Sequence, residues 1–379
     1  MANGFAEGPA QALRDYLVAR RAAVVTILHP LTREQGTRHV LTTYAGGRRV
    51  LERTRRLPLK APLSYALDPF VPLLPPRVDA WFGFNPLACA RGLLARRMGR
   101  ARRVVLWSVD FVPDRFGAGT LPTRVYDRLD RTCCTRADAR IELSEAAREA
   151  RSRRHGLGAD ASPTHVVPMG AWLDRVVTTP ADGFERRRVV FLGHLVARQG
   201  VDVLLEALAV LKARGEELTA DVIGSGPLEA ALRDRARALG LETTVRFHGF
   251  VADHRDVERL LAESSVAVAP YRPGEGTFTE YADPGKLKAY LAAGLPIVLT
   301  DVPPNASELA RAAGAEVVPY DATGIADALS RSVASPERWQ ERRRAALDHA
   351  RRFDWPILLG DVLRKLELEP PDASSSAVP

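Results

Sequence analysis

The chain of 379 residues has only three cysteines and no long hydrophobic run. Cys133 and Cys134 are adjacent and the third is Cys89, which excludes a disulfide framework and offers no metal-ligand spacing. No apolar stretch approaches the roughly 18 to 20 residues that a membrane-crossing helix needs. The first residues also lack the basic-then-apolar pattern of a secretion signal. These absences indicate a globular protein of the reducing cytosol.

Acidic residues are scarce in the first half of the chain. Residues 1–180 hold 29 Lys and Arg against 16 Asp and Glu, whereas the remainder is acidic. This excess is typical of a face that meets an anionic membrane surface, an acidic substrate or a nucleic acid, although a solvated basic surface would give the same count. The sequence has no nucleic-acid-binding motif and no interleaved aromatic residues, so we expect no nucleic-acid partner.

Strand and helix patterns alternate along most of the chain, once from about residue 79 and again from residue 189. This alternation predicts an α/β fold with two tandem Rossmann-like, doubly wound domains and a ligand at the carboxyl ends of the strands, in a cleft between them. We expect an N-terminal, acceptor-side domain at 1–176 and a C-terminal donor domain at 177–352. A terminal helix at 353–368 would cross back to the first domain, and 369–379 would be a disordered tail. Residues 171–186 are interpreted as a linker.

Two segments interrupt this alternation. Residues 3–9 form a glycine-rich loop, with Gly4 and Gly8 expected on the acceptor side, but only Met1 and Ala2 precede it. The first strand is therefore either vestigial or begins upstream. Residues 47–76 are interpreted as irregular. Their basic and apolar side chains suit contact with a membrane surface, and a proline-rich loop packed on its own domain is the alternative.

The stretch from Asp283 to Val298 predicts a helix followed by a buried strand. Asp283 is placed as the N-cap and Pro284 as the first helical residue, where its missing N–H costs nothing. Gly285 leaves room for a ligand, and Lys286 lies on an exposed first turn. Free amides and the positive end of the helix dipole make this N-terminus an anion site. An ordinary amphipathic helix is the alternative interpretation.

Glycine-bearing loops follow several predicted strands of the second half. They lie at 193–200, 224–227, 249–251 and 283–286. Glycines at such positions let backbone amides approach a phosphate or a base. His194, Arg198 and Lys286 are the cations within reach of a shared anion, although His194 could equally be a satisfied loop histidine.

The order of these loops resembles the donor domain of family 4 glycosyltransferases, retaining enzymes of the GT-B fold. The matched features are the loop at 193–200, "VIGSGPLE" at 222–229, "VRFHGFV" at 245–251, "VAVAPY" at 266–271 and the Lys-Leu…Gly-x-Pro-Ile-Val run at 286–298. The resemblance is weaker over the first domain, where residues 143–146 and 167–170 resemble the last elements of the family's N-terminal domain. The helix that follows Phe353-Asp354-Trp355 resembles the family's terminal helix.

The resemblance implies a nucleotide-diphosphate sugar as co-substrate, with no cofactor and no metal, which agrees with the absence of an Asp-x-Asp signature. Lys286 would stabilise the leaving diphosphate, and Phe250 and Val251 would meet the base. Asp110, at the end of a strand, would orient an acceptor hydroxyl, or else cap a helix or pair with Arg115. The donor-binding residues would be Gly193, His194, Arg198, Gln199, Gly224, Gly226, Phe250, Val251, Tyr271, Asp283, Pro284, Gly285 and Leu287.

Four positions depart from the family pattern. His194 and Gln199 stand where the family usually has Arg and Lys, and Tyr281 and Ala289 stand where it has a pair of glutamates. Lys286 and Arg198 would then carry more of the diphosphate charge, with Glu280 or Asp283 as nearby carboxylates. The chain is therefore either a divergent branch or one with reduced activity.

The sequence thus predicts a glycosyltransferase that acts, with retention, on a lipid-linked or cell-envelope glycan. We expect it in the cytoplasm, at the inner face of an anionic membrane. The alternative is a catalytically silent GT-B protein that binds a nucleotide sugar or a partner enzyme.

Overall fold

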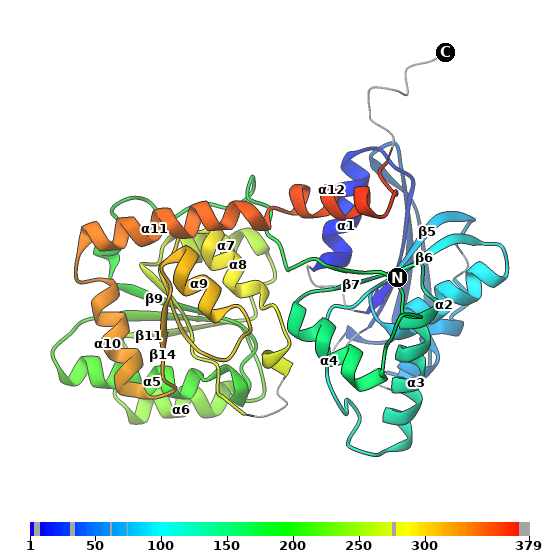
Figure 1. Ribbon diagram of the computed structural model, residues 1–379. Coiled ribbons are helices and arrows are strands. Elements are labelled where there is room, and N and C mark those ends of the chain that lie inside the picture. Colours follow the sequence, from blue (N-terminus) through cyan, green and yellow to red (C-terminus); the bar gives the residue numbers. More distant parts are fainter. Residues whose placement is uncertain (4–7, 31–34, 61–62, 74, 275–277, 371–379) are drawn as a thin grey trace, which may run out of the picture. The chain divides into compact units, whose positions relative to one another are not determined.

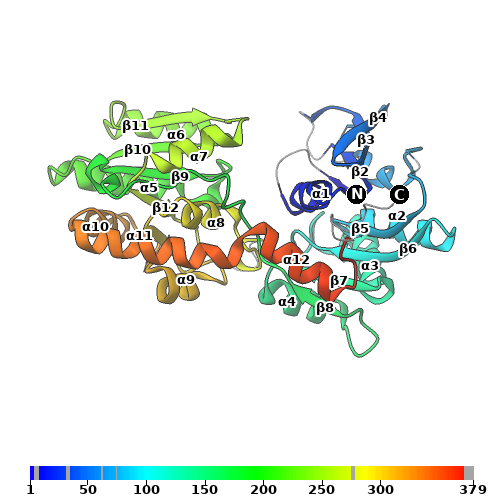
Figure 2. The ribbon, with the colours of Figure 1, turned by 90° about the horizontal axis from the view of Figure 1, so that it is seen from above.

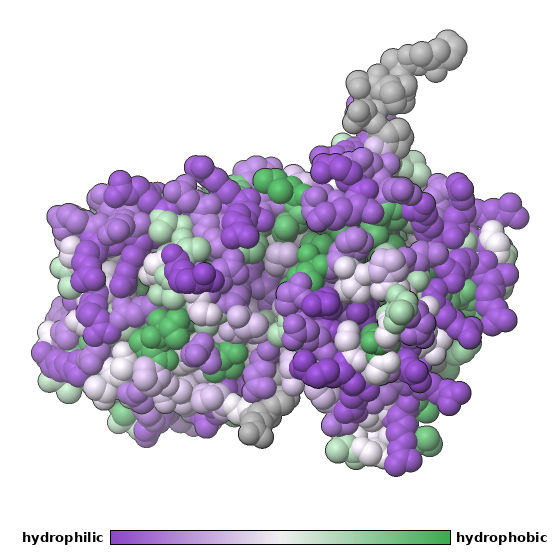
Figure 3. All heavy atoms as spheres, in the orientation of Figure 1, coloured by the Kyte–Doolittle hydropathy of each residue, from purple (hydrophilic) through white to green (hydrophobic). Residues whose placement is uncertain are grey.

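The computed structural model describes residues 1–3, 8–30, 35–60, 63–73, 75–274 and 278–370. Gly4 and the residues of the predicted tail from 371 onward lie outside these ranges. The chain divides into two units, residues 1–169 with 355–379 and residues 170–354, each of which is described by itself. Hydrophilic side chains cover most of the visible surface of both units (Figure 3).

Unit 1 contains two four-stranded sheets. The first sheet runs β1 (Ala2–Asn3), β2 (Val24–His29), β3 (Arg38–Ala45) and β4 (Arg48–Arg56), and the second runs β5 (Val78–Gly83), β6 (Ala101–Trp107), β7 (Ala139–Glu142) and β8 (Thr164–Val166). β1 pairs parallel with β2, so a two-residue strand does precede the glycine-rich loop. The amide of Phe84 donates to the Met1 carbonyl at 3.0 Å, which links the edges of the two sheets.

The helices of unit 1 are α1 (Pro9–Ala19), α2 (Pro86–Arg97), α3 (Leu121–Arg136), α4 (Glu145–His155) and α12 (Trp355–Lys365). Ser144 caps α4, because its hydroxyl accepts from the amide of Ala147 at 3.0 Å. The terminal helix α12 belongs to unit 1 and packs on α1, where a Cβ on Gly360 would lie 3.0 Å from the Tyr16 hydroxyl.

The expectation that residues 47–76 are irregular is wrong for their first part. β4 is an exposed edge strand that pairs antiparallel with β3 (Figure 2). Gly46 and Gly47, with φ angles of 59° and 81°, form the two-residue connection. Such a turn needs positive φ at both positions, and its twist matches that of the flanking strands. Short 3₁₀ turns follow at Leu63–Ala66 and Asp68–Phe70.

Unit 2 contains one fully parallel sheet in the order β11-β10-β9-β12-β13-β14. Its strands are β9 (Arg188–Leu192), β10 (Thr219–Ile223), β11 (Val245–Gly249), β12 (Val266–Ala269), β13 (Ile297–Thr300) and β14 (Glu316–Val318). This is the 3-2-1-4-5-6 order of a dinucleotide-binding domain. The order reverses between β9 and β12, so ligands are expected outside the carboxyl ends of these two strands.

Helices cover both faces of this sheet (Figure 1). They are α5 (Val201–Ala213), α6 (Glu229–Ala238), α7 (His254–Ala262), α8 (Gly285–Ala292), α9 (Ala306–Ala313), α10 (Ala322–Ser332) and α11 (Pro336–Ala350). One buried core joins α5, α6 and α10 to the sheet, and another joins α7, α8, α9 and α11 to its opposite face. The alternation of strands and helices predicted from residue 189 onward is confirmed.

The predicted linker is part of unit 2 rather than a free connection, and the unit begins at Gly170 instead of residue 177. The amide of Ala171 donates to the Phe353 carbonyl at 2.8 Å, and that of Thr179 donates to the Ala293 carbonyl at 2.8 Å. Backbone hydrogen bonds therefore fix this segment although it has no periodic pattern.

Candidate functional site

Loops from neighbouring strands of unit 2 meet at the switch point between β9 and β12. After β9, the amide of Leu195 donates to the Ser225 carbonyl at 2.9 Å. After β12, the amide of Arg272 donates to the Arg198 carbonyl at 3.0 Å. After β10, the amide of Gly224 donates to the Gly249 carbonyl at 2.8 Å. The sequence-predicted loops thus form one connected edge.

Two glycines of this edge are required by close backbone contacts. A Cβ on Gly224, whose φ is 129°, would lie 2.0 Å from the Gly193 carbonyl oxygen. A Cβ on Gly200 would lie 1.7 Å from the Pro270 carbonyl oxygen. Any side chain at either position would push the loops apart. Contact between loops therefore accounts for these glycines without invoking a ligand.

Lys286 points from α8 into this edge. Its ammonium donates to Oε1 of Gln199 and lies 4.2 Å from the centre of the Phe191 ring and 5.0 Å from that of Tyr271. A Cβ on Gly193 would lie 2.8 Å from the same nitrogen. Lys286 is partly buried, not exposed as predicted, because the ring of Phe191 and the 193–200 loop cover it.

Burial lowers the pKa of Lys286 to about 7. Among the residues that the structure describes, no carboxylate lies within ion-pair distance of this lysine. The hydroxyl of Tyr271 is also buried without a hydrogen-bond partner in the described part of the chain. A cation with aromatic neighbours and no counter-charge is suited to receive an anion, which would restore its charged form.

Asp283 does not cap α8, contrary to the prediction. The helix begins at Gly285 with Pro284 as its N-cap residue, and no side chain caps it. Instead, the buried carboxylate of Asp283 accepts from the ammonium of Lys288 and, at 3.0 Å, from the side-chain amide of Asn305. The buried charge of Lys288 explains this choice, since an unpaired ammonium in the core would be costly.

The remaining predicted donor-side residues differ in accessibility. His194 and Arg198 are exposed, and Phe250 is 74% exposed. Val251 packs partly against the core, and Leu287 is fully buried. Gly226 approaches Leu195, whose carbonyl oxygen a Cβ would meet at 2.4 Å.

Asp110 of unit 1 forms the ion pair that the sequence left as an alternative. Its Oδ1 lies 2.5 Å from Nη2 of Arg115, and its backbone carbonyl accepts from Arg151 at 2.8 Å. Gly8 precedes α1 in extended backbone, and its carbonyl accepts from the Ala12 amide at 2.9 Å. Both residues are therefore held in place, and neither yet shows a ligand role.

A buried charge network beneath Asp110 was missed by the sequence analysis. Arg151 pairs with Asp130, donates to the hydroxyl of Ser108, and lies 2.9 Å from Glu142 through Nε. Burial alone would raise the pKa of Asp130, but Arg151 and His155 hold it below its ordinary value. The residues are far apart in sequence, and their charged types predict surface positions, so no local pattern reveals them.

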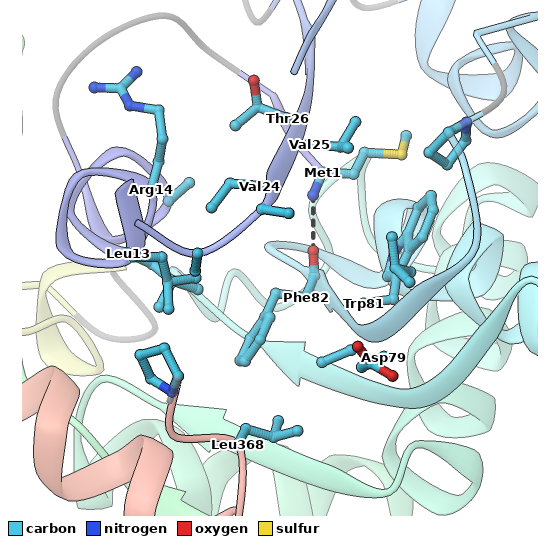
Figure 4. Close-up of a pocket in the computed structure, with 18 of the residues that line it drawn as sticks. Met1, Leu13, Arg14, Val24, Val25, Thr26, Asp79, Trp81, Phe82 and Leu368 are labelled. Carbon is cyan, nitrogen blue, oxygen red and sulfur yellow. Dashed lines mark hydrogen bonds between the residues drawn. The ribbon is translucent and has the colours of Figure 1, made fainter. Parts of the chain in front are cut away.

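Unit 1 also contains a cavity of about 660 Å³. Leu13, Val24, Phe82 and Leu368 line it, with Arg14 and Asp79 among the charged residues around it (Figure 4). Its mainly apolar wall is distinct from the loops of unit 2. None of the predicted site residues lines it.

No helix in the described ranges combines the length and apolar character needed to cross a membrane.

The family match lies within the second unit. Residues 186–335 match the family described as Glycosyl transferases group 1. A phosphatidyl-myo-inositol mannosyltransferase of Mycobacterium leprae is 28% identical over 233 residues, which cover 60% of this chain and 58% of that protein. A GDP-mannose-dependent alpha-(1-6)-phosphatidylinositol dimannoside mannosyltransferase of Mycobacterium tuberculosis is 29% identical over 265 residues, with coverages of 67% and 65%. The matches thus span less than two thirds of these relatives.

Solved structures share the fold. HepE of Anabaena, in complex with UDP, aligns with a TM-score of 0.62 and 20% identity over 76% of this chain and 78% of that one. Sucrose-phosphate synthase of Thermosynechococcus elongatus aligns with a TM-score of 0.60 and 19% identity over 76% and 74%.

Proposed function

We propose that the chain is a GT-B glycosyltransferase that transfers a hexosyl group from a nucleotide-diphosphate sugar to an acceptor hydroxyl, with retention at the anomeric carbon. The observation that carries this proposal is the position of Lys286. Its ammonium lies between the 193–200 loop and the start of α8, at the edge where the strand order reverses.

The diphosphate would lie against Lys286 and the free amides that begin α8. Charge develops on the leaving diphosphate as the bond to the sugar breaks, and preorganised donors at that point lower the barrier. Since the pKa of free Lys286 is about 7, binding of the diphosphate would draw a proton onto this lysine. Protein cations and amides therefore serve the leaving group, and the proposed reaction needs no metal.

Other residues of the same edge would orient the donor. The exposed ring of Phe250, which follows the Gly224–Gly249 contact, would stack on the base, with Val251 beside it. The exposed side chains of His194 and Arg198 would contact the phosphates. In unit 1, Asp110 is proposed to orient the acceptor hydroxyl, with Arg115 fixing its carboxylate.

The acceptor is proposed to be a lipid-linked or cell-envelope glycan at the cytosolic face of a membrane. The names of the two relatives reported above contain phosphatidyl-myo-inositol and phosphatidylinositol dimannoside. Unit 1 offers a matching surface, since every residue of β4 is exposed and five of its nine residues are arginines. Exposed Leu63 and Phe70 follow β4, at 66% and 72% exposure. Arginines beside exposed apolar side chains suit an anionic membrane surface.

A panel of GDP, UDP, GDP-mannose and UDP-glucose tests the donor site by thermal shift. A ligand at about 100 times its dissociation constant stabilises the folded state by roughly 2.7 kcal/mol. At least one nucleotide should raise the unfolding temperature of the parent, and Lys286→Ala should reduce this rise. If no nucleotide shifts either protein, the donor site is wrongly placed.

The second candidate is a silent nucleotide-sugar-binding protein, and one observation favours it. Asp283 is committed to Lys288 and Asn305, so it is poorly placed to replace the family glutamates missing at Tyr281 and Ala289. Release of nucleoside diphosphate from the donor that binds, with and without a lipid extract as acceptor, separates the two. Binding without release would favour the silent protein.

A further inference from the structure

Three metal-ligating side chains meet inside unit 1, and none of them has a role in the proposed sugar transfer. They are His29 at the end of β2, His39 at the start of β3 and Asp68 in the 3₁₀ turn at Asp68–Phe70. All three side chains have no solvent exposure. Among the described residues, this is a group whose candidate ligand atoms all lie within 4.8 Å of one another.

The distances define a common point for an ion. Nδ1 of His29 lies 2.6 Å from Nδ1 of His39, and each of these nitrogens lies 3.6 Å from the same oxygen, Oδ1 of Asp68. A triangle with these sides has its centre about 1.9 Å from each corner. An ion slightly out of this plane would lie about 2.0 to 2.1 Å from all three atoms, which is the usual distance for zinc with imidazole and carboxylate ligands.

Polar atoms of the two histidines have no hydrogen-bond partner in the described part of the chain. The two Nδ1 atoms can share one proton, but Nε2 of both rings is buried without a partner in the described part of the chain. The hydroxyl of Ser64, in the preceding 3₁₀ turn, is also buried without a partner in the described part of the chain. Unpaired polar atoms in a protein core are destabilising. Because an ion on the two Nδ1 atoms would leave each Nε2 as an N–H donor, ordered water would have to accept from these donors.

The backbone that carries the three ligands is fixed independently. The antiparallel ladder of β2 and β3 fixes the positions of His29 and His39, because Leu28 lies opposite Val40 in it. Arg91 of α2 holds the segment of Asp68, because its guanidinium donates to the carbonyls of Asp68, Val71 and Leu73 at 3.3, 3.0 and 2.6 Å. A site whose ligands are positioned in advance loses little conformational entropy when the ion binds.

We propose that His29, His39 and Asp68 bind a divalent transition metal, with zinc as the best-fitting ion, which ties the β2–β3 hairpin to the segment at residues 63–73. Two imidazoles and one carboxylate suit zinc and its neighbours in the transition series and disfavour magnesium, which prefers oxygen ligands. The complete burial of the ligands assigns the ion a structural role, with no part in sugar transfer.

Binding of the ion would change the separation of the two rings. A bound ion would replace the shared proton between the two nitrogens, so we expect their separation to widen from 2.6 Å toward about 3.3 Å, the edge of a tetrahedron with ligand distances of about 2.0 Å.

The test is metal retention by the full chain. The parent protein is stripped with a chelator, equilibrated with excess zinc or magnesium, desalted and analysed by elemental mass spectrometry. We expect one zinc per chain and no magnesium. His39→Asn and Asp68→Asn should each weaken zinc affinity at least tenfold, whereas His165→Asn, which removes a histidine on β8 of the same unit, should retain the full equivalent.

Two further measurements separate ligand loss from misfolding. Near-ultraviolet circular dichroism reports whether each variant is folded, and Asp68→Asn keeps the size of the side chain. Zinc should raise the unfolding temperature of the parent and of His165→Asn, but not that of the other two variants. Less than a tenth of an equivalent of zinc on the folded parent would overturn the proposal. Equal zinc retention by folded Asp68→Asn and the parent would also overturn it.

Discussion

Arg151 and Lys286 are two cations with opposite surroundings. Arg151 of unit 1 lies among Asp130, Glu142 and Ser108. The carboxylates of Asp130 and Glu142 raise the pKa of Arg151, although burial opposes this. Lys286 of unit 2 faces aromatic rings and an amide oxygen, and burial lowers its pKa. The contrast distinguishes two uses of a buried charge. A cation that already has its carboxylates holds the fold together, and one without them is available for an external anion.

The largest expected effect is on stability when Arg151 is lost. Arg151→Met leaves Asp130 and Glu142 buried without their main counter-charge, and breaking a buried pair in this way typically costs about 3–5 kcal/mol. Urea denaturation measures the change. Arg153→Met on the same helix is the control, because Arg153 is 71% exposed and its pair with Glu149 is a surface pair. Equal losses for both variants would contradict a structural role for Arg151.

The second effect is on catalysis when Lys286 is lost. Lys286→Ala should remain folded but transfer sugar roughly 10² to 10³ times more slowly, which is the usual loss for one preorganised donor. Lys286→Arg should recover only part of the transfer rate, because the guanidinium group of arginine is planar and reaches further than an ammonium. Arg198→Ala is the control with a smaller loss, since Arg198 is exposed. A folded Lys286→Ala protein with the parent rate would place the diphosphate elsewhere.

The third effect is the pH dependence of nucleotide affinity. The pKa of free Lys286 is about 7, and a bound diphosphate would raise it, because an opposite charge favours the ammonium. Below pH 7 the lysine is already charged in the free protein, so it adds no pH dependence to the nucleotide affinity. Above pH 7 the complex must take up a proton, and affinity should fall by up to about tenfold per pH unit until the pKa of the complex is passed.

Isothermal titration calorimetry in buffers of different ionisation enthalpy measures this proton uptake. Lys286→Met is the matched variant, because it keeps the length of the side chain and removes the titrating group. Its affinity should lack the slope above pH 7. If nucleotide affinity falls equally with pH for the parent and Lys286→Met, another group takes up the proton. Lys286 would then not be the cation that receives the external anion.

The smallest expected effect extends the comparison to exposed cations. Arg53 and Arg55 on β4 are exposed, with no ion pair among the described residues, so they should meet a diffuse anionic surface. Each such arginine adds about 1 kcal/mol to vesicle binding, so Arg53→Gln should weaken sedimentation with anionic vesicles about fivefold. Added salt should weaken it further. Binding to neutral and anionic vesicles alike would contradict the membrane proposal.

Much of the fold was predictable because its signals are local. The alternation of strand and helix patterns from residue 189 onward predicted the α/β fold of unit 2. β4 was missed because its arginines obscured a strand pattern, although Gly46-Gly47 is a hairpin signal. The fixed structure of the segment interpreted as a linker was missed, because it comes from hydrogen bonds to distant residues such as Phe353.

The candidate site divides in the same way. The loops and Lys286 were predicted from their order along the chain, and the structure brings Gly193, Gln199 and Lys286 together. The role of Asp283 was mispredicted, because an adjacent helix start suggests a cap and only the fold shows that Lys288 is buried beside it. The His29, His39 and Asp68 cluster depends on strand pairing and on Arg91, which no spacing rule reveals.

The contact of Gly224 with the Gly193 carbonyl also constrains motion. With so little clearance between the two loops, neither can shift alone without a collision, and the hydrogen bond between Leu195 and Ser225 couples them further. The loops after β9 and β10 should therefore open and close as one cooperative unit. In hydrogen exchange, their amides should gain protection together when a nucleotide binds, and a bulky residue at 224 should release both loops at once.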